Sequence, residues 1–231
     1  MRQPMLERGV YTIPEACRYI NAPDMPHLPD RKPMSPITLH AWFLPRSDRM
    51  GLGPLFESEW NKTGGDFAIS FLNLIEAFVA RFFKDSGVKP KRIRRTHEVL
   101  QRVLQTPHPF ASLELRTNGQ EIISCSSDKQ LVDYVAKQLY FPEMRNYLAG
   151  IEYDPSTLLA QTWSLAKGVA ISPKLGFGRP IIRGTGVSTL IVANQYLANG
   201  KDAALVARLF KIPEEGVLDA FGFENRLGHL N

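Results

Sequence analysis

The residues Tyr11-Thr-Ile-Pro-Glu-Ala-Cys-Arg-Tyr-Ile20 have the sequence features of a helix and its start. Thr12 suits an N-cap, Pro14 the first helical turn, and Glu15 the acidic position of a capping box. Apolar residues then recur at i, i+3, i+4 and i+7, which is one face of a helix. We therefore expect a short amphipathic helix here, with a buried side made of Ile13, Ala16, Cys17 and Ile20.

A second short helix is expected after a proline-rich stretch, residues 21–36, which five prolines keep out of regular structure. Ser35 can cap this helix, and Pro45 ends it. Two short helices joined by a loop make a helix-turn-helix candidate. Residues 46–60 hold several glycines and prolines, and they fit either a wing beside the second helix or a plain loop.

The polar residues of this second helix have two interpretations. Thr38 and His40 could reach base edges in a DNA major groove, or they could simply pack. Trp42 and Phe43 are better explained as core anchors.

Residues 71–83 give the clearest helical pattern in the chain. Apolar residues form a wide face, interrupted only at Asn73, Glu76 and Arg81, which we expect to point away from the core. Such a helix belongs in a core or at the seam of a dimer.

The densest basic segment comes next. Eight Lys or Arg and two acids lie between Arg81 and Arg102. A helix opening at residue 89 would bury Ile93, His97, Leu100 and Leu104. Its cations either cover a solvated face or meet phosphates, where arginine forms strong paired hydrogen bonds. The candidate DNA contacts are Thr38, His40, Arg46, Lys89, Lys91, Arg92, Arg94 and Arg95.

Residues 106–150 are expected to form a hairpin and a helix. Leu113 and Leu115 alternate with polar residues, and Asn118-Gly119 is a strong hairpin-turn signal. A capped helix is predicted over residues 128–139.

The last part, residues 151–231, starts with short strand-like pieces, followed by the turn 178–187. Helices are predicted over residues 188–198, 203–210 and 213–223. Residues 206–218 have the spacing of a second helix-turn-helix, in which Ala207 packs the first helix and Val217 and Leu218 hold the second. The turn is either structural or an interaction loop with projecting arginines.

Composition limits the class of protein. The chain has 231 residues, 44% hydrophobic residues and a net charge of +5, which suits a globular protein with room for a nucleic-acid partner. No stretch suggests a membrane span or a signal peptide. Cys17 and Cys125 are expected to be buried thiols in a reducing cytoplasm.

Signatures of catalysis are lacking in the sequence. There is no Walker-type phosphate loop, no HExxH and no GxSxG motif, and the five histidines are spread singly. We therefore expect a non-catalytic protein without a cofactor or a metal.

The residues Gly178-Arg-Pro-Ile-Ile-Arg-Gly-Thr-Gly-Val187, with the helices after them, resemble a family of small bacterial antitoxin domains. The rest resembles longer VapB-like antitoxins, which carry a MerR-like winged helix-turn-helix before that domain. Residues 11–16 and 35–42 fit this pattern.

The resemblance implies an antitoxin of a type II toxin–antitoxin pair. Such a protein would bind and silence a PIN-domain ribonuclease toxin, bind its own operator DNA, repress transcription, and form a homodimer. A cation that pairs with carboxylates in the toxin's metal-binding site would provide inhibition. The candidate toxin contacts are Arg179, Arg183, Arg226, Phe221 and Phe223.

The sequence thus predicts a mainly helical α+β protein in two domains: a winged helix-turn-helix module with a hairpin and helix extension over residues 1–150, and a small helical, second helix-turn-helix-like antitoxin domain over residues 151–231. One alternative is a MerR-like regulator that senses a small ligand through its C-terminal half. Another is an enzyme acting on nucleic acid, which would need a metal cluster.

Overall fold

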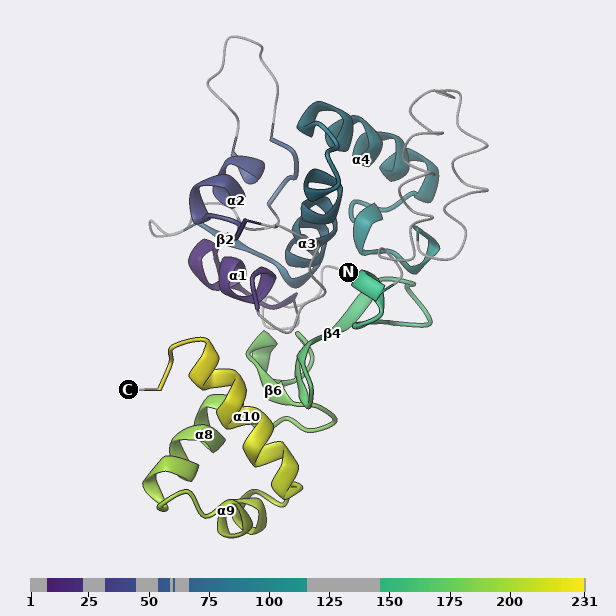
Figure 1. Ribbon diagram of the computed structural model, residues 1–231. Helices are drawn as coiled ribbons and strands as arrows, with labels where there is room; N and C mark the ends of the chain where they lie inside the picture. Colours follow the sequence, from purple (N-terminus) through teal and green to yellow (C-terminus); the bar gives the residue numbers. More distant parts are fainter. Residues whose placement is uncertain are drawn as a thin grey trace. The chain divides into compact units, whose positions relative to one another are not determined.

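The computed structural model describes residues 8–22, 32–44, 54–58, 60, 67–115 and 146–230. The chain divides into two compact units. The N-terminal unit comprises Tyr11–Ile20 and Pro26–Ala160, and the C-terminal unit comprises Gln161–Asn231 with Met1–Val10 and Asn21–Met25. Helices predominate and strands are short (Figure 1). The mainly helical α+β architecture predicted from the sequence is confirmed.

The two short helices predicted at the start of the chain are present as α1 (Ile13–Ile20) and α2 (Pro36–Phe43). The side chain of Thr12 accepts a hydrogen bond from the Glu15 amide at 3.4 Å. Ser35 accepts one from the Thr38 amide at 3.2 Å. Both caps satisfy amides that a helix leaves without an internal partner. The two helices pack against each other.

A two-residue antiparallel ladder joins β1 (Tyr11–Thr12) to β2 (Ala68–Ile69). The wing expected within residues 46–60 stays a prediction, because most of that stretch lies outside the described residues. The part that the structure describes, residues 54–58 and 60, contains no strand.

The core of the N-terminal unit is built around α3 (Phe71–Asp85). The expectation that Asn73, Glu76 and Arg81 point away from the core is wrong, since their exposed fractions are 0%, 1% and 2%. Nearly all side chains of this helix are buried, and α4 (Pro90–Leu104) and the 3-10 turn η2 (Pro109–Ala111) both pack on it. The polar groups are buried with partners.

Asn73 is paired with a main-chain carbonyl, and Arg81 is paired with a side chain four residues later in the same helix. Asn73 Nδ2 donates to the carbonyl of Glu57 at 3.2 Å, and Arg81 Nε donates to Asp85 Oδ2 at 2.9 Å. A buried polar group that keeps its hydrogen bonds avoids most of the cost of leaving water.

The stretch after η2 differs from its prediction. Residues 113–115 are helical rather than extended. Ser112 forms an isolated bridge with Leu159, and the Leu113 amide donates to the Leu158 carbonyl at 2.7 Å. These contacts fix the start of the helix despite the alternating pattern. The turn predicted at residues 118–119 and the helix at 128–139 lie outside the described residues.

The short strands predicted in the last part are β3 (Ile151–Tyr153), β4 (Ala160–Ala166), β5 (Val169–Ile171) and β6 (Ile181–Ile182). Their order is β3-β4-β5-β6, and β4–β5 and β5–β6 are antiparallel.

Three helices complete the C-terminal unit, α8 (Thr189–Ala198), α9 (Ala203–Phe210) and α10 (Glu214–Arg226), as predicted. Their shared core contains Ile182, Val192, Val206, Ala207, Ile212, Val217 and Ala220. Ala207 and Val217 therefore pack as expected. Leu218 does not, because its side chain is 50% exposed.

Cys17 is a buried thiol, as expected, and burial raises its pKa to about 11. Cys125 lies outside the described residues. Among the described helices, none has the length and apolar character needed to cross a bilayer.

Candidate functional site

The basic helix α4 has one buried, apolar side and one exposed, cationic side. Its first residue, Pro90, suits a helix start. Ile93, His97 and Leu100 are buried, as predicted, whereas Leu104 is half-buried. The exposed cations at its start are Lys89, Lys91, Arg92 and Arg95. This surface offers several positive charges along one short segment, the arrangement that phosphate binding requires.

Arg94 differs from its neighbours. Its side chain is half-buried, and Nε donates to the carbonyl of Pro54 at 3.3 Å. The amides of Leu55 and Phe56, which follow Pro54, both donate to the carbonyl of Trp42 at the end of α2. Arg94 therefore ties α4 to the segment that covers the end of α2.

Arg95 forms an exposed ion pair with Glu98, with Arg95 Nη1 3.6 Å from Glu98 Oε2. Exposed pairs of this kind contribute little to stability, about 0–1 kcal/mol. A phosphate could therefore replace Glu98 as the partner of Arg95 at small cost.

The predicted DNA contacts on α2 are only partly accessible. Thr38 is half-buried, and its hydroxyl lies 2.9 Å from the cap hydroxyl of Ser35. His40 is half-buried and meets the ring of Phe67 edge to face, with ring centroids 5.2 Å apart. Trp42 and Phe43 are buried as predicted. Arg46 lies outside the described residues.

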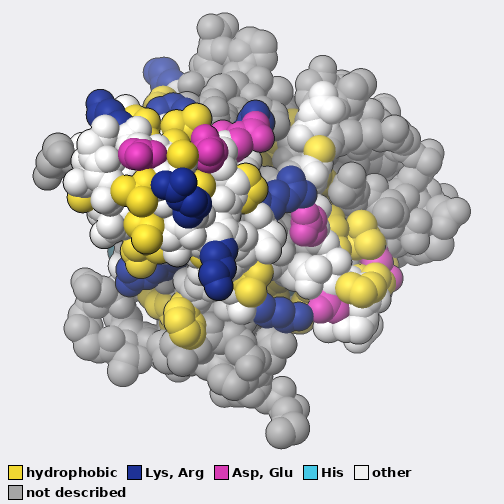
Figure 2. Space-filling view, turned by 90° about the horizontal axis from the view of Figure 1, so that it is seen from below, with side chains coloured by type: hydrophobic (Ala, Val, Ile, Leu, Met, Phe, Trp, Pro, Cys, Tyr) yellow, Lys and Arg dark blue, Asp and Glu magenta, His cyan; other side chains and the backbone are white. Residues whose placement is uncertain are grey.

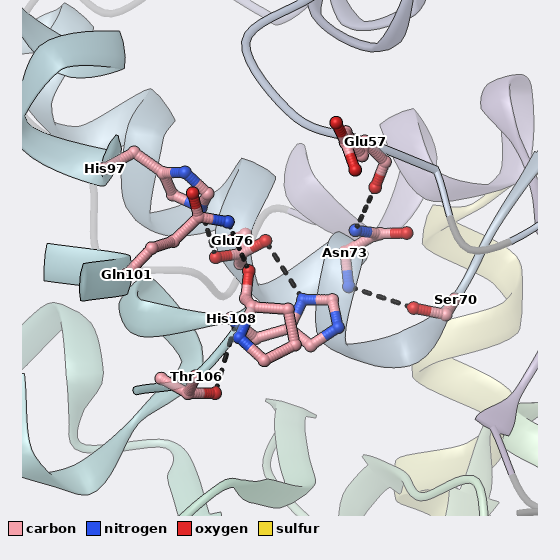
Figure 3. Close-up of polar contacts among 9 residues, drawn as sticks. Glu57, Ser70, Asn73, Glu76, His97, Gln101, Thr106 and His108 are labelled. Carbon is pink, nitrogen blue, oxygen red and sulfur yellow. Dashed lines mark hydrogen bonds and ion pairs between the residues drawn. The ribbon is translucent and has the colours of Figure 1, made fainter. Parts of the chain in front are cut away.

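Behind the cationic side of α4 lies a buried carboxylate held by two histidines (Figure 3). His97 Nε2 lies 2.7 Å from Glu76 Oε1, and His108 Nδ1 lies 3.1 Å from Glu76 Oε2. All three side chains are buried. Because a carboxylate only accepts, each ring donates through the nitrogen that faces it. The cluster joins α3, α4 and the residue before η2.

Opposing effects set the pKa of the Glu76 carboxyl. Burial raises it, but the charge of His97 and the hydrogen bonds and charge from the two histidines outweigh burial. The pKa therefore ends below the ordinary 4.5, and Glu76 is ionised near neutral pH. Among the residues that the structure describes, no group of three His, Cys, Asp or Glu side chains could hold a metal ion. The cluster is a structural anchor for α4.

The sequence does not indicate the Glu76–His97–His108 cluster, because the three residues lie far apart along the chain. Residues 97 and 108 belong to different elements, and Glu76 was expected to face solvent. One available signal was the position of Glu76 within a helix whose apolar residues lie on nearly every side.

In the C-terminal unit, the turn between β5 and α8 positions two of the predicted toxin contacts. Arg179 and Arg183 are both exposed. The Arg183 amide donates to the carbonyl of Gly168, and the Thr185 hydroxyl donates to the carbonyl of Ile182 at 2.8 Å. The turn is thus held by a hydrogen bond within it and by another to Gly168, which precedes β5.

A chain of contacts brings the end of α10 next to this turn. The hydroxyl of Thr189, the first residue of α8, lies 3.2 Å from the Pro180 carbonyl and also contacts Glu224 Oε1. Glu224 is buried in α10. Arg179 and Arg226 therefore come from adjoining segments, and Arg226 is exposed.

The two predicted aromatic contacts are less accessible. Phe221 is half-buried against Tyr196, with ring centroids 5.1 Å apart. Phe223 is 1% exposed, so its ring belongs to the core of this unit.

The second helix-turn-helix candidate is formed by α9 and α10. Lys211 turns the chain in the left-handed region at φ 54°. The following helix starts with two exposed acids, Glu214 and Glu215, and Glu215 forms an ion pair with Lys167. In DNA-reading helix-turn-helix proteins the start of the second helix approaches the bases. Acids at this place would meet phosphates with like charge.

No family model matches the chain, but comparison with known proteins finds a named relative and a similar crystal structure. The chain is 26% identical over 200 residues to a Mycobacterium tuberculosis (strain ATCC 25618 / H37Rv) protein named "Putative antitoxin VapB45". The match covers 77% of this chain and 78% of that protein. It is 25% identical to the chain in the crystal structure of Rv2018 from Mycobacterium tuberculosis, with a TM-score of 0.67, covering 91% of this chain and 96% of that one. The named similarity is thus to a protein whose name assigns it to the antitoxins.

Proposed function

We propose that the chain is the non-catalytic antitoxin of a type II toxin–antitoxin pair. It binds and neutralises a PIN-domain ribonuclease toxin in the cytoplasm and represses its own operon by binding operator DNA. The similarity over 200 residues to a protein named as an antitoxin carries this proposal. The division of labour is an N-terminal DNA-binding part, residues 1–150, and a C-terminal toxin-binding part, residues 151–231.

The charge distribution favours the N-terminal unit for DNA binding. Exposed cations gather at the start of α4, whereas α10 starts with exposed acids. Cations that neutralise phosphates release counterions, and this release drives binding. Lys89, Lys91, Arg92 and Arg95 provide affinity, and Thr38 and His40 of α2 provide sequence choice. Arg46 is a further candidate DNA contact from the sequence. Arg94 positions α4.

The toxin surface would use the exposed arginines of the C-terminal unit. Ribonucleases of the PIN class are expected to hold a metal among carboxylates, and an arginine forms paired hydrogen bonds with such groups. Arg179, Arg183 and Arg226 are exposed and suit this role. Phe221 would add a partly exposed apolar contact, and Phe223 would act by supporting α10.

A homodimer fits this function, because a palindromic operator matches a two-fold symmetric protein. We therefore expect two copies of the chain on one operator.

Co-expression with the product of the neighbouring gene tests the toxin half of the proposal. A co-purifying nuclease whose RNase activity is quenched by this chain is the expected result. If the chain purifies alone and the neighbour has no nuclease activity, the antitoxin function is refuted, and a ligand-sensing regulator becomes the better explanation.

Titration of the protein into a DNA fragment from upstream of its gene tests the proposed operator binding. The double variant Arg92→Gln, Arg95→Gln is expected to bind more weakly and to lower the slope of log K against log salt by about 2, roughly 0.9 per phosphate contact. Lys201→Gln with Arg208→Gln removes two exposed cations from the C-terminal unit and serves as the control. Equal slopes for the two double variants would refute the assignment of α4 to DNA.

A further inference from the structure

The most exposed aromatic residue of the C-terminal unit lies in the turn before β6. Phe177 is 69% exposed, and Leu175, two residues earlier, is 44% exposed. Folding gains little from a ring left in water, because the hydrophobic effect rewards only the area removed from it. Single exposed apolar residues are ordinary, so exposure alone does not mark a site.

The backbone makes Phe177 unusual. Its φ is +55°, between Gly176 at +59° and Gly178 at +81°. A bulky side chain in the left-handed region costs free energy that glycine avoids. The turn therefore holds a strained aromatic residue where glycine would suit the backbone better. Such strain is found where a function needs the side chain presented.

The segment that carries Phe177 is basic in sequence. Residues 172–188 contain Lys174, Arg179 and Arg183 and no Asp or Glu, and all three cations are exposed. On the face that Figure 2 presents, Lys and Arg side chains lie among hydrophobic side chains and some Asp and Glu side chains. An apolar anchor bordered by arginine is the composition typical of binding hot spots between proteins.

Several amides in and after this turn donate to main-chain carbonyls. Those of Gly178 and Arg179 donate to the carbonyls of Ser172 and Gly176 at 3.1 and 3.0 Å, and that of Arg183 donates to the Gly168 carbonyl at 2.8 Å. An anion-binding nest needs successive amides that point outward. A phosphate nest built on the consecutive amides of Gly178 and Arg179 is therefore disfavoured. Leu175 disfavours a base-stacking surface, since an aliphatic side chain has no π-face.

We propose that Phe177 and Leu175 form the apolar anchor of a protein-binding surface, rimmed by Lys174 and Arg179, and that its occupant is the toxin. The complementary toxin surface is an apolar pocket bordered by carboxylates. This inference rests on the proposed antitoxin function and adds the apolar residue that anchors the contact with the toxin. The arginines then provide orientation and charge matching.

Phe177→Gly separates binding from folding. Glycine accepts the positive φ, so this variant is expected to melt at the same temperature as the wild type or above it. The chain is titrated into the purified product of the neighbouring gene by calorimetry. The expected result is a Kd about 30-fold weaker, the effect of losing a hot-spot side chain. Leu209→Ala, at a residue 60% exposed on α9, is the matched control and should bind as the wild type does.

The outcomes are distinguishable. If the wild type binds and Phe177→Gly binds equally well, the inference fails and the antitoxin function stands. If the wild type does not bind, both fail. A fluorescent single-stranded oligonucleotide is titrated in parallel, and binding that Phe177→Gly abolishes would make the turn a nucleic-acid platform and overturn the inference.

Discussion

Replacing Glu76 by leucine tests whether the buried carboxylate holds the N-terminal unit together. Leucine has nearly the volume of glutamate but cannot accept a hydrogen bond. His97 and His108 would each keep a buried ring N–H without its partner. Three segments, α3, α4 and the residue before η2, would lose their common polar link.

The size of the effect follows from these two hydrogen bonds. A buried donor left without an acceptor costs about 1–3 kcal/mol, so two of them cost about 2–6 kcal/mol. This agrees with the roughly 3–5 kcal/mol lost when one member of a buried ion pair is removed. Glu76→Gln should cost less, about 1–3 kcal/mol, because the amide oxygen accepts from one ring and the amide group donates to the other ring in its alternate tautomer.

Hydrogen exchange measured by mass spectrometry suits this test, since it follows each unit separately. Protection in α3 and α4 should fall by the stated free energies, whereas α8 and α10 serve as the internal control and should change little. A loss below about 1 kcal/mol for Glu76→Leu, or equal losses for leucine and glutamine, would refute the structural role of the charged cluster.

The same cluster predicts a pH dependence. The pKa of Glu76 in the folded protein is below the ordinary 4.5, so the unfolded chain binds a proton at this group before the folded one does. The stabilisation is therefore fully present above about pH 4.5 and is lost as pH falls through the folded pKa. Urea unfolding of the wild type and of Glu76→Gln should give stabilities that converge as the pH is lowered below 4.5. A constant difference would contradict this.

The remaining predictions concern caps and turns. Ser35→Ala removes the side-chain acceptor of the α2 cap and should cost about 1 kcal/mol, measured by hydrogen exchange in α2; unchanged protection would contradict the cap. Gly176→Ala should lower the melting temperature, because the backbone is at φ +59° and a Cβ there would lie 2.6 Å from Ile181 Cγ2. Thr189→Val removes the hydroxyl that meets the buried Glu224 and should cost about 1–3 kcal/mol in a urea titration, with Thr185→Val as a comparison nearer the surface.

The sequence determined most of the helices and their caps. Ser35 caps α2 by accepting a hydrogen bond from an amide three residues later. The apolar spacing of residues 71–83 and 203–210 indicates which sides of those helices are buried. Both signals depend on residues three or four positions apart. Because those signals are local, they can be recognised in the sequence before the fold is known. The resemblance to antitoxin domains likewise came from local motifs.

Other sequence patterns were overridden by distant contacts. Leu113 and Leu115 alternate like a strand, yet residues 113–115 are helical, next to a bridge between Ser112 and Leu159. Leu218 has the spacing of a core residue and is half exposed. A periodic pattern shows which residues share a face but not how much of that face a neighbouring element covers.

Local sequence patterns are sufficient to indicate where helices begin and that a glycine-rich turn precedes α8. Folding is needed to place Glu76 between His97 and His108, to bring Arg94 to the Pro54 carbonyl, and to leave Phe177 in solvent at a positive φ. The physical reason is the range of the interactions. Capping and helical periodicity act within a few residues, whereas burial and pairing of charges depend on segments that meet only after the chain has folded.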